Sequence, residues 1–132
     1  MGKQKDTVYR AIYLIWRVIS LIRRHPPFGG TTFTSKAQKE ELRAVYPKGY
    51  KPGRADYCTA WFVKAADYMV RNRDIRCAFV STSSITQGEQ VAALWGLLCD
   101  RGVRLNFAYT SFPWNSEAAR TAAVTCVITG FS

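Results

Sequence analysis

The chain has 132 residues, which is the size of a single domain. Hydrophobic residues make up 48% of it and aromatic residues 14%, so the composition supplies a core and excludes a disordered chain. The formal net charge of +10, from 19 basic and 9 acidic residues, is typical of proteins attracted to nucleic-acid phosphates, although many small basic proteins bind none.

The chain begins with an apolar segment whose pattern does not decide between helix and strand. From Tyr9 to Ile22, apolar residues fall on nearly every side of a helical wheel. Arg10 and Arg17 interrupt this run, and the stretches between them are too short to span a membrane. No small-residue cleavage site follows, so we predict neither a signal peptide nor a membrane partner. We interpret residues 1–24 as a segment of uncertain origin, either packed on the domain or joined to it by truncation or frameshift.

The rest of the chain alternates between helical and strand patterns. Ser35 is a candidate N-cap for the first helix, and Thr86 is a candidate cap that forms a capping box with Glu89. The predicted elements in chain order are a helix over 36–45, a loop over 47–53, a helix over 56–72, a strand over 75–81, a helix over 89–99 that Gly102 ends, and strands over 103–110 and 122–131. Strand, helix and strand in succession predict an α/β fold with helices covering a sheet.

The cysteines do not form a metal-binding pattern. Cys58, Cys77, Cys99 and Cys126 contain no Cys-x-x-Cys pair, and His25, the one histidine, is distant from them in sequence. Each lies among apolar neighbours in a predicted helix or strand, so we expect buried free thiols, with disulfides as the alternative. Free thiols are typical of a reducing cytoplasm, which is where we expect the protein to be.

The stretch His25-Pro26-Pro27-Phe28 bears most directly on chemistry. Proline fixes φ and has no N–H, so a Pro-Pro loop is stiff and its carbonyl groups are held in fixed directions. The aromatic ring that follows can stack on a base removed from a duplex. Taken alone, the stretch is better explained as a turn that packs a nearby aromatic residue.

Further segments accompany this loop in a characteristic order and spacing. These segments are residues 32–39, 53–62, 78–91, 106–109, 112–114 and 122–131. Together they resemble the second half of the catalytic domain of S-adenosylmethionine-dependent DNA adenine methyltransferases, of the kind found in restriction–modification and phage-defence systems. The resemblance runs from about His25 to the last residue, and Ser-Ile-Thr-Gln-Gly-Glu-Gln-Val at residues 84–91 is its most specific part.

The resemblance implies a fold, a cofactor and partners. The fold is a partial Rossmann-like methyltransferase sheet with flanking helices over residues 25–132, in which the last strand inserts antiparallel between the two before it. The family uses S-adenosylmethionine, but the glycine-rich turn and the ribose-binding acid of the family have no counterpart upstream of His25. We therefore expect no tight cofactor binding by this chain alone. The implied partners are DNA, an N-terminal half of the methyltransferase and a target-recognition domain.

The resemblance also assigns the catalytic loop to His25, Pro26, Pro27 and Phe28. The family has asparagine where this chain has His25, and the asparagine amide accepts a proton from the adenine amine. A neutral imidazole offers one acceptor nitrogen and a protonated imidazole offers none, so we predict a degenerate enzyme that is inactive alone. The alternative is a non-catalytic, basic module that binds nucleic acid or another partner and retains the fold.

Two further groups of residues are candidates for contacts with DNA. The first is the basic set that follows the Pro-Pro loop, for which an ordinary solvated surface is the alternative: Lys36, Lys39, Lys48, Lys51 and Arg54. The second is Ser83 and Gln87, which follow the predicted strand over 75–81. Open α/β sheets place ligands beyond the carboxyl ends of their strands, where these two residues would lie.

Overall fold

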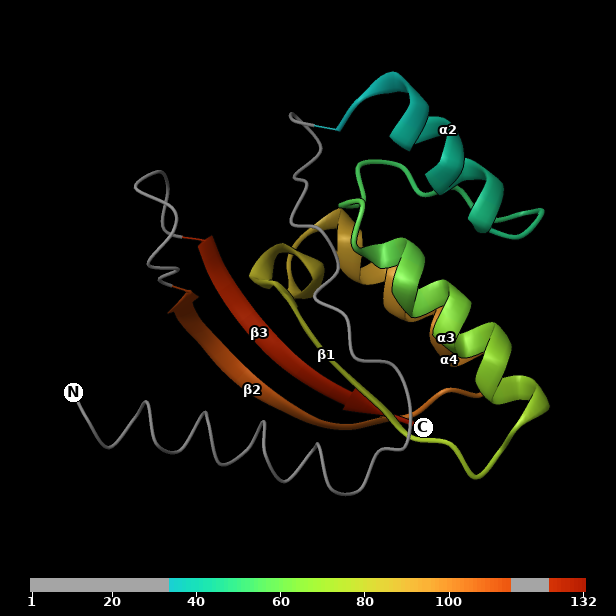
Figure 1. Cartoon of the computed structure of the whole chain (residues 1–132), viewed down its shortest axis with the longest axis vertical. Coiled ribbons are helices and arrows are strands. Elements are labelled where there is room, and N and C mark those ends of the chain that lie inside the picture. Colours follow the sequence, from blue (N-terminus) through green and yellow to red (C-terminus); the bar gives the residue numbers. More distant parts are fainter. Residues whose placement is uncertain (1–33, 115–123) are drawn as a thin grey trace.

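The computed structural model describes residues 34–114 and 124–132, in which helices pack on a three-stranded sheet (Figure 1). Residues 1–24 and the His25–Phe28 loop lie outside the described residues. The elements are α2 (Lys36–Val45), α3 (Thr59–Arg71), β1 (Cys77–Thr82), the 3-10 turn η1 (Ser83–Thr86), the π-helix η2 (Val91–Gly96), α4 (Leu97–Asp100), β2 (Leu105–Trp114) and β3 (Val124–Phe131).

The sheet has the order β1-β3-β2, and β3 is antiparallel to both neighbours. The last strand is therefore inserted between the two strands that precede it, which confirms the predicted α/β fold and its antiparallel last strand. Cys126 to Phe131 are all buried, as expected for a central strand with both faces covered. Because β1 and β2 both oppose β3, they run in the same direction and end at the same edge of the sheet.

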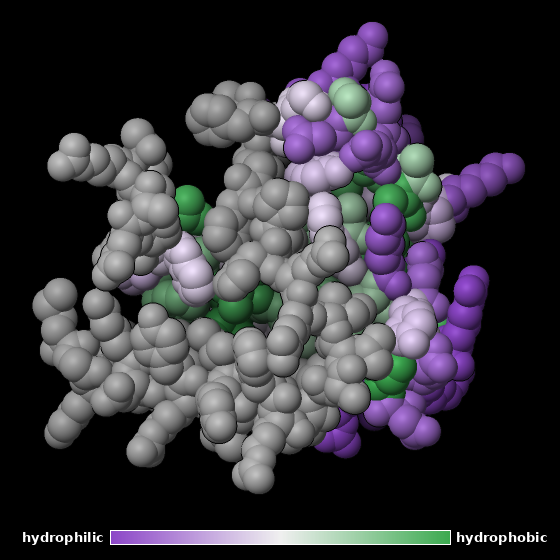
Figure 2. Space-filling model, viewed as in Figure 1, coloured by the Kyte–Doolittle hydropathy of each residue, from purple (hydrophilic) through white to green (hydrophobic). Residues whose placement is uncertain are grey.

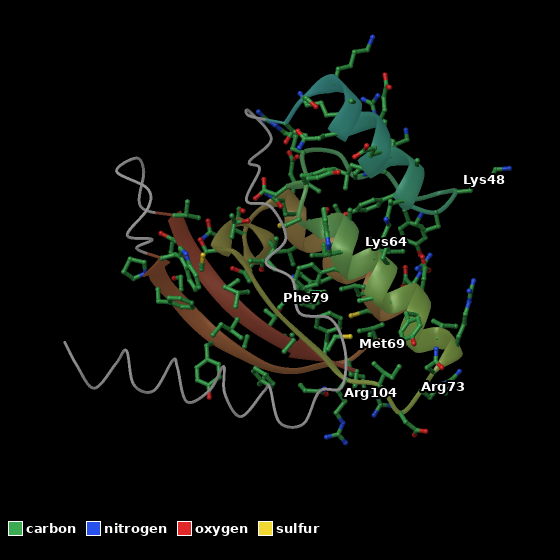
Figure 3. All side chains as sticks on the ribbon, viewed as in Figure 1. Lys48, Lys64, Met69, Arg73, Phe79 and Arg104 are labelled. Atoms are coloured by element: carbon green, nitrogen blue, oxygen red, sulfur yellow. The ribbon has the colours of Figure 1, made fainter. Side chains whose placement is uncertain are left out.

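The main core lies between one face of this sheet and the helices α3, η2 and α4. Phe62 of α3 is at its centre, with ring centroids 4.9 Å from Phe79 and 5.4 Å from Phe131. Trp95 of η2 lies 5.9 Å from Phe62 on another side. Figure 3 shows Phe79 and Met69 between the sheet and α3. This aromatic cluster ties the helical layer to β1 and β3.

The N-terminus of α2 has the predicted cap. The Ser35 hydroxyl accepts a bond of 3.2 Å from the Gln38 backbone N–H, and the Gln38 side chain accepts one of 2.9 Å from the Ser35 N–H. These two bonds satisfy backbone groups that a helix start leaves without partners. The observed bounds of α2 are those predicted from the sequence.

The predicted capping box of Thr86 and Glu89 is wrong. The Thr86 hydroxyl donates to the Ser83 carbonyl over 2.7 Å and so closes η1, rather than capping the helix that follows. Between them, Gly88 has φ +55, a left-handed backbone that glycine adopts at little cost and that redirects the chain into the helix.

The prediction of four buried thiols is wrong for one of them. Cys58, Cys77 and Cys126 are buried, and burial raises the pKa of each to about 11. Cys99 is exposed, because it lies on the outer side of α4 while Leu97 and Leu98 take the buried positions. All four cysteines are free.

Candidate functional site

Two strands end side by side at one edge of the sheet. Thr82, Cys126 and Phe112 form a row across the sheet, because β1 and β2 pair with the same residue of β3. The turn η1 follows Thr82 at this edge, and β2 ends at Trp114, two residues after Phe112. The ring centroids of Phe112 and Trp114 are 6.3 Å apart. We call residues 82–87 and 112–114 the C-terminal edge. It is the position at which open α/β sheets bind ligands.

A buried carboxylate holds the turn at this edge. Asp56 is 4% exposed, and its Oδ2 accepts hydrogen bonds from the hydroxyls of Ser84 and, over 2.9 Å, of Thr82. The Asp56 backbone N–H donates to Oε1 of Gln90 over 3.0 Å. One residue thus connects the segment before α3 with the end of β1 and its turn, through its side chain, and with the start of the next helix, through its backbone N–H.

The predicted helix over 56–72 starts three residues later, at Thr59, because Asp56 is used in this way. Its carbonyl accepts bonds from the Thr59 N–H and the Thr59 hydroxyl, so the residue precedes the helix and closes a turn. Sequence reasoning missed Asp56, Ser84 and Gln90. An acid before an apolar helix is an ordinary first-turn residue, and no local signal reveals partners that lie 26 to 34 residues away.

A second contact holds the turn from the core side. The indole N–H of Trp95 donates to the Ile85 carbonyl over 2.9 Å, and the Ile85 side chain is fully buried. Within the turn, the Gln87 N–H donates to the Ser84 carbonyl over 3.0 Å. The backbone of η1 is therefore fixed by contacts with β1, with the π-helix and within itself.

The two polar residues predicted to contact a ligand lie at this edge. Ser83 is half-buried and begins η1, while Gln87 is exposed and follows it. Neither side chain has a hydrogen-bond partner within the described ranges, 34–114 and 124–132. Their predicted position at the carboxyl end of a strand is observed, and their role stays a prediction.

The five predicted basic residues are exposed but do not form one cluster. Lys36 and Lys39 are on α2, and Arg54 lies two residues before the anchored Asp56. Lys48 and Lys51 flank Tyr50, whose hydroxyl donates to Asp100 at the end of α4 over 2.6 Å. Figure 3 shows Lys48 pointing away from the sheet. Arg54 is thus close in sequence to a residue that binds the C-terminal edge, while Lys48 points away from the sheet.

Hydrophilic side chains gather over α2 and along the outer side of α3 (Figure 2).

At the opposite edge of the sheet, where β1 and β2 begin, there is a cavity of about 280 Å³. Its apolar lining includes Met69, Ile75 and Val103, and its basic lining is Arg73, Arg101 and Arg104. Arg101 is already paired with Asp67 on α3. Figure 3 shows Arg73 and Arg104 at this end of the molecule.

The described part of the chain contains no group of three or more His, Cys, Asp or Glu side chains arranged to hold a metal ion. Within the same residues, no helix is both long enough and apolar enough to cross a membrane.

The sheet, with its last strand inserted antiparallel in the middle, and the turn at the C-terminal edge define a methyltransferase-type α/β domain. The family described as "MmeI, DNA-methyltransferase domain" matches residues 14–132, and the chain belongs to this family. This membership confirms the resemblance to restriction–modification DNA methyltransferases.

Two known proteins show the similarity directly. The chain is 41% identical over 107 residues to DNA methyltransferase A of Bacillus subtilis (strain 168), an alignment that covers 81% of this chain and 12% of that protein. It is also similar to the Type IIL restriction-modification enzyme MmeI, whose structure was solved in complex with DNA, with a TM-score of 0.76 and 48% identity. That comparison covers 82% of this chain and 14% of MmeI. The chain therefore spans a small part of the length of both proteins.

Proposed function

We propose that this chain supplies the DNA-facing half of an MmeI-type adenine-N6 methyltransferase domain and transfers no methyl group on its own. The observation that supports the proposal is the C-terminal edge, where the fixed turn bears Ser83 and Gln87 and the end of β2 bears the rings of Phe112 and Trp114. The cation Arg54 lies two residues before Asp56, which binds this turn. Hydroxyl, amide, cationic and aromatic groups together suit a nucleotide, which offers a phosphate and a flat base.

The described residues do not fit S-adenosylmethionine, the methyl donor of this family. Binding its ribose takes a free carboxylate at the end of a strand, but the buried Asp56 at the C-terminal edge already accepts two hydroxyl hydrogens on Oδ2. The cavity at the opposite edge is lined by Arg73, Arg101 and Arg104, whose charge repels a sulfonium cation. The sequence before His25 also contains no glycine-rich turn.

Calorimetry with S-adenosylmethionine tests this part of the proposal. The 132-residue chain is expected to show no binding in the micromolar range. Low-micromolar binding would contradict the claim that the cofactor half is supplied by other residues. The control is the same titration with a relative that contains both halves of the domain.

DNA binding by this chain is expected to be weak, independent of sequence and driven by phosphate contacts. Affinity then falls steeply between ~50 and ~200 mM salt, because each neutralised phosphate releases counterions. Arg54→Glu and Lys48→Glu form a matched pair, since they make the same change of charge at different places. We expect Arg54→Glu to weaken binding more, because Arg54 lies two residues before Asp56, whose carboxylate binds the turn, and Lys48 points away from the sheet. Equal losses would show that the charge acts without a defined site.

The activity of a reconstituted domain depends on His25. Asparagine can accept an amine proton through its amide oxygen, whereas a protonated imidazole accepts none. When the chain is combined with the upstream half of a relative, His25→Asn is expected to raise methyl transfer to adenine about a hundredfold or more. Equal rates for the two versions would show that histidine substitutes adequately.

The alternative function is a non-catalytic module that binds nucleic acid through the same edge. The histidine at position 25 favours it, since it replaces the acceptor amide of the family. Reconstitution separates the two functions. A domain that stays inactive with His25→Asn, yet binds DNA with Arg54-dependent affinity, supports the module over the enzyme.

A further inference from the structure

The turn η1 is held by more side-chain contacts than its length requires. Asp56 accepts from Thr82 over 2.9 Å and from Ser84, and these two hydroxyls are themselves 2.9 Å apart. On the opposite side, Trp95 donates to the Ile85 carbonyl over 2.9 Å. A four-residue connection of this kind ordinarily needs no more than its own backbone bonds. The additional contacts fix the direction of a turn whose residues Ser83 and Gln87 are open to a ligand.

The π-helix explains how one helix serves both sides of the turn. Gln90 immediately precedes η2 and binds the Asp56 backbone N–H, while Trp95 lies five residues later and binds Ile85. In an α-helix, five residues make about 1.4 turns, so these two side chains would point to different sides. In a π-helix, the i to i+5 bonding brings such residues close to one side. The π segment therefore allows Gln90 to reach Asp56 and Trp95 to reach η1 from nearly the same side of the helix.

The carboxylate at the centre of this arrangement has a cost for stability. Asp56 is 4% exposed, and across the described residues it has no cationic partner. A buried charge held by hydroxyl groups is expensive to desolvate, and an apolar residue of similar size often serves stability equally well. The benefit that the structure shows for Asp56 is geometric: it fixes Thr82 and Ser84 relative to the start of α3.

We propose that Asp56 is a positioning residue that holds the Ser83–Thr86 turn in the conformation that contacts the unpaired nucleotide. This proposal rests on the proposed function, because that function supplies the DNA partner. Asp56 itself touches no ligand. It acts through Ser84 and Thr82, which set the backbone from which Ser83 and Gln87 extend.

Hydrogen exchange on the 132-residue chain tests the first half of the proposal. The Gln87 amide reports on the turn, since it donates to Ser84, and the amides of β1 report on the core. Asp56→Ala is expected to speed exchange at Gln87 about tenfold, with β1 unchanged, as the loss of hydrogen bonds at one place predicts. Asp56→Asn retains an acceptor oxygen and is expected to restore slow exchange. Tyr50→Phe, which removes another hydroxyl–carboxylate bond, is the control and leaves Gln87 unchanged.

Ser84→Ala provides the same test if Asp56→Ala does not fold. It removes one donor to the carboxylate without leaving a large cavity, and it is expected to speed exchange at Gln87 in the same way. Unchanged exchange at Gln87 in both variants overturns the proposal. Exchange that rises equally in the turn and in β1 also overturns it, because Asp56 would then support the whole fold rather than the turn.

A duplex with one mismatched adenine, added at low salt, tests the second half. It is expected to slow Gln87 exchange in the unaltered chain. Asp56→Ala is expected to bind the same duplex with the same salt dependence and to give no such protection, while Asp56→Asn recovers it. If the turn is loosened in Asp56→Ala but the duplex protects Gln87 in no version, DNA contact by this turn is refuted and the proposed function fails at this point. If Asp56→Ala is protected as well as the unaltered chain, positioning by Asp56 is refuted while the DNA contact stands.

Discussion

The two edges of the sheet differ in how their ends are held. At the C-terminal edge, side chains of Asp56, Gln90 and Trp95 reach across from other elements to fix the turn after β1. At the opposite edge, backbone bonds of 2.7 and 3.0 Å join Arg104 and Ser132 beside an open cavity. The side-chain contacts there, Ser132 with Asn106 and Arg101 with Asp67, are exposed. Part-buried side-chain bonds are thus a feature of the C-terminal edge.

This difference shows where the fold uses specific interactions. Both edges rest on the same aromatic core, so packing alone does not distinguish them. The buried polar network at the C-terminal edge adds little net stability per bond, but it fixes one arrangement of the turn. The two edges therefore differ in their buried side-chain hydrogen bonds rather than in their hydrophobic contacts.

The largest expected effect comes from removing the core that both edges share. Phe62→Ala is expected to destabilise the fold by about 3–5 kcal/mol, because the ring contacts Phe79, Phe131 and Trp95 and is fully buried. Urea unfolding measures the change. Tyr68→Ala, on the same helix at 41% exposed, is the control and should cost within about 0.5 kcal/mol. Similar losses for the two would contradict a shared core centred on Phe62.

The buried thiols make stability depend on alkaline pH. Burial raises the pKa of Cys58, Cys77 and Cys126 from 9.0 to about 11. Below pH 9 the thiols are protonated in both the folded and the unfolded chain, so they do not change the stability. Between pH 9 and 11 the unfolded chain has lost thiol protons that the folded chain keeps, so the stability falls as the pH rises. Unfolding curves measured at pH 8, 9, 10 and 11 give the slope of the free energy of unfolding against pH. Cys77→Ser removes one of the three buried thiols and should reduce the slope.

At the edge with the cavity, β2 and β3 approach each other closely at Gly130. A Cβ on Gly130 would lie 2.1 Å from the Phe107 ring of the paired strand β2. Gly130→Ala is therefore expected to cost about 1–3 kcal/mol, as overpacking commonly does, unless the ring moves aside. Phe107→Ala should relieve most of that cost in the double variant, which a double-mutant cycle measures. Gly96→Ala is the matched control, because its Cβ meets nothing within 4 Å. Additive costs would show that Phe107 does not enforce glycine at position 130.

The smallest expected effect on stability comes from a change at the C-terminal edge, Trp95→Phe. Trp95→Phe keeps most of the ring in the core and removes the indole N–H that binds Ile85. The expected cost is about 1 kcal/mol, the net value of one hydrogen bond. Hydrogen exchange should show the loosening at the Gln87 amide, with the amides of β2 and β3 unchanged. Loosening at both edges would mean that Trp95 acts through the core and not through the turn.

The sequence was informative where one residue type repeats along an element. The apolar run that ends at Phe131 predicts a central strand, and Ser35 before a helical pattern predicts a cap; the structure has both. Contacts between distant segments could not be predicted, since nothing local links Asp56 with Thr82 or Gln90. The cap expected at Thr86 is wrong because its hydroxyl donates to the Ser83 carbonyl instead, over 2.7 Å.

The order of β1, β3 and β2 came from resemblance rather than from pattern. Periodicity identifies strands but does not order them, whereas kinship with methyltransferases predicts an inserted last strand. For the basic residues, position in the sequence did not predict their arrangement in space. They are close in sequence, but Lys36 and Lys39 lie on α2, whereas the other three lie in the segment after it, where Tyr50 binds Asp100.

Photocrosslinking to DNA tests the central claim, that the C-terminal edge and not the opposite edge contacts the nucleotide. With Cys99→Ser removing the exposed thiol, a benzophenone maleimide is attached at Gln87→Cys or at Val70→Cys, which lines the cavity and is 50% exposed. Both positions are uncharged and accessible, so they differ mainly in the edge that they occupy. A duplex with a mismatched adenine is expected to crosslink at low salt through position 87 and only weakly through position 70. Equal crosslinking, or a stronger yield at position 70, would contradict it.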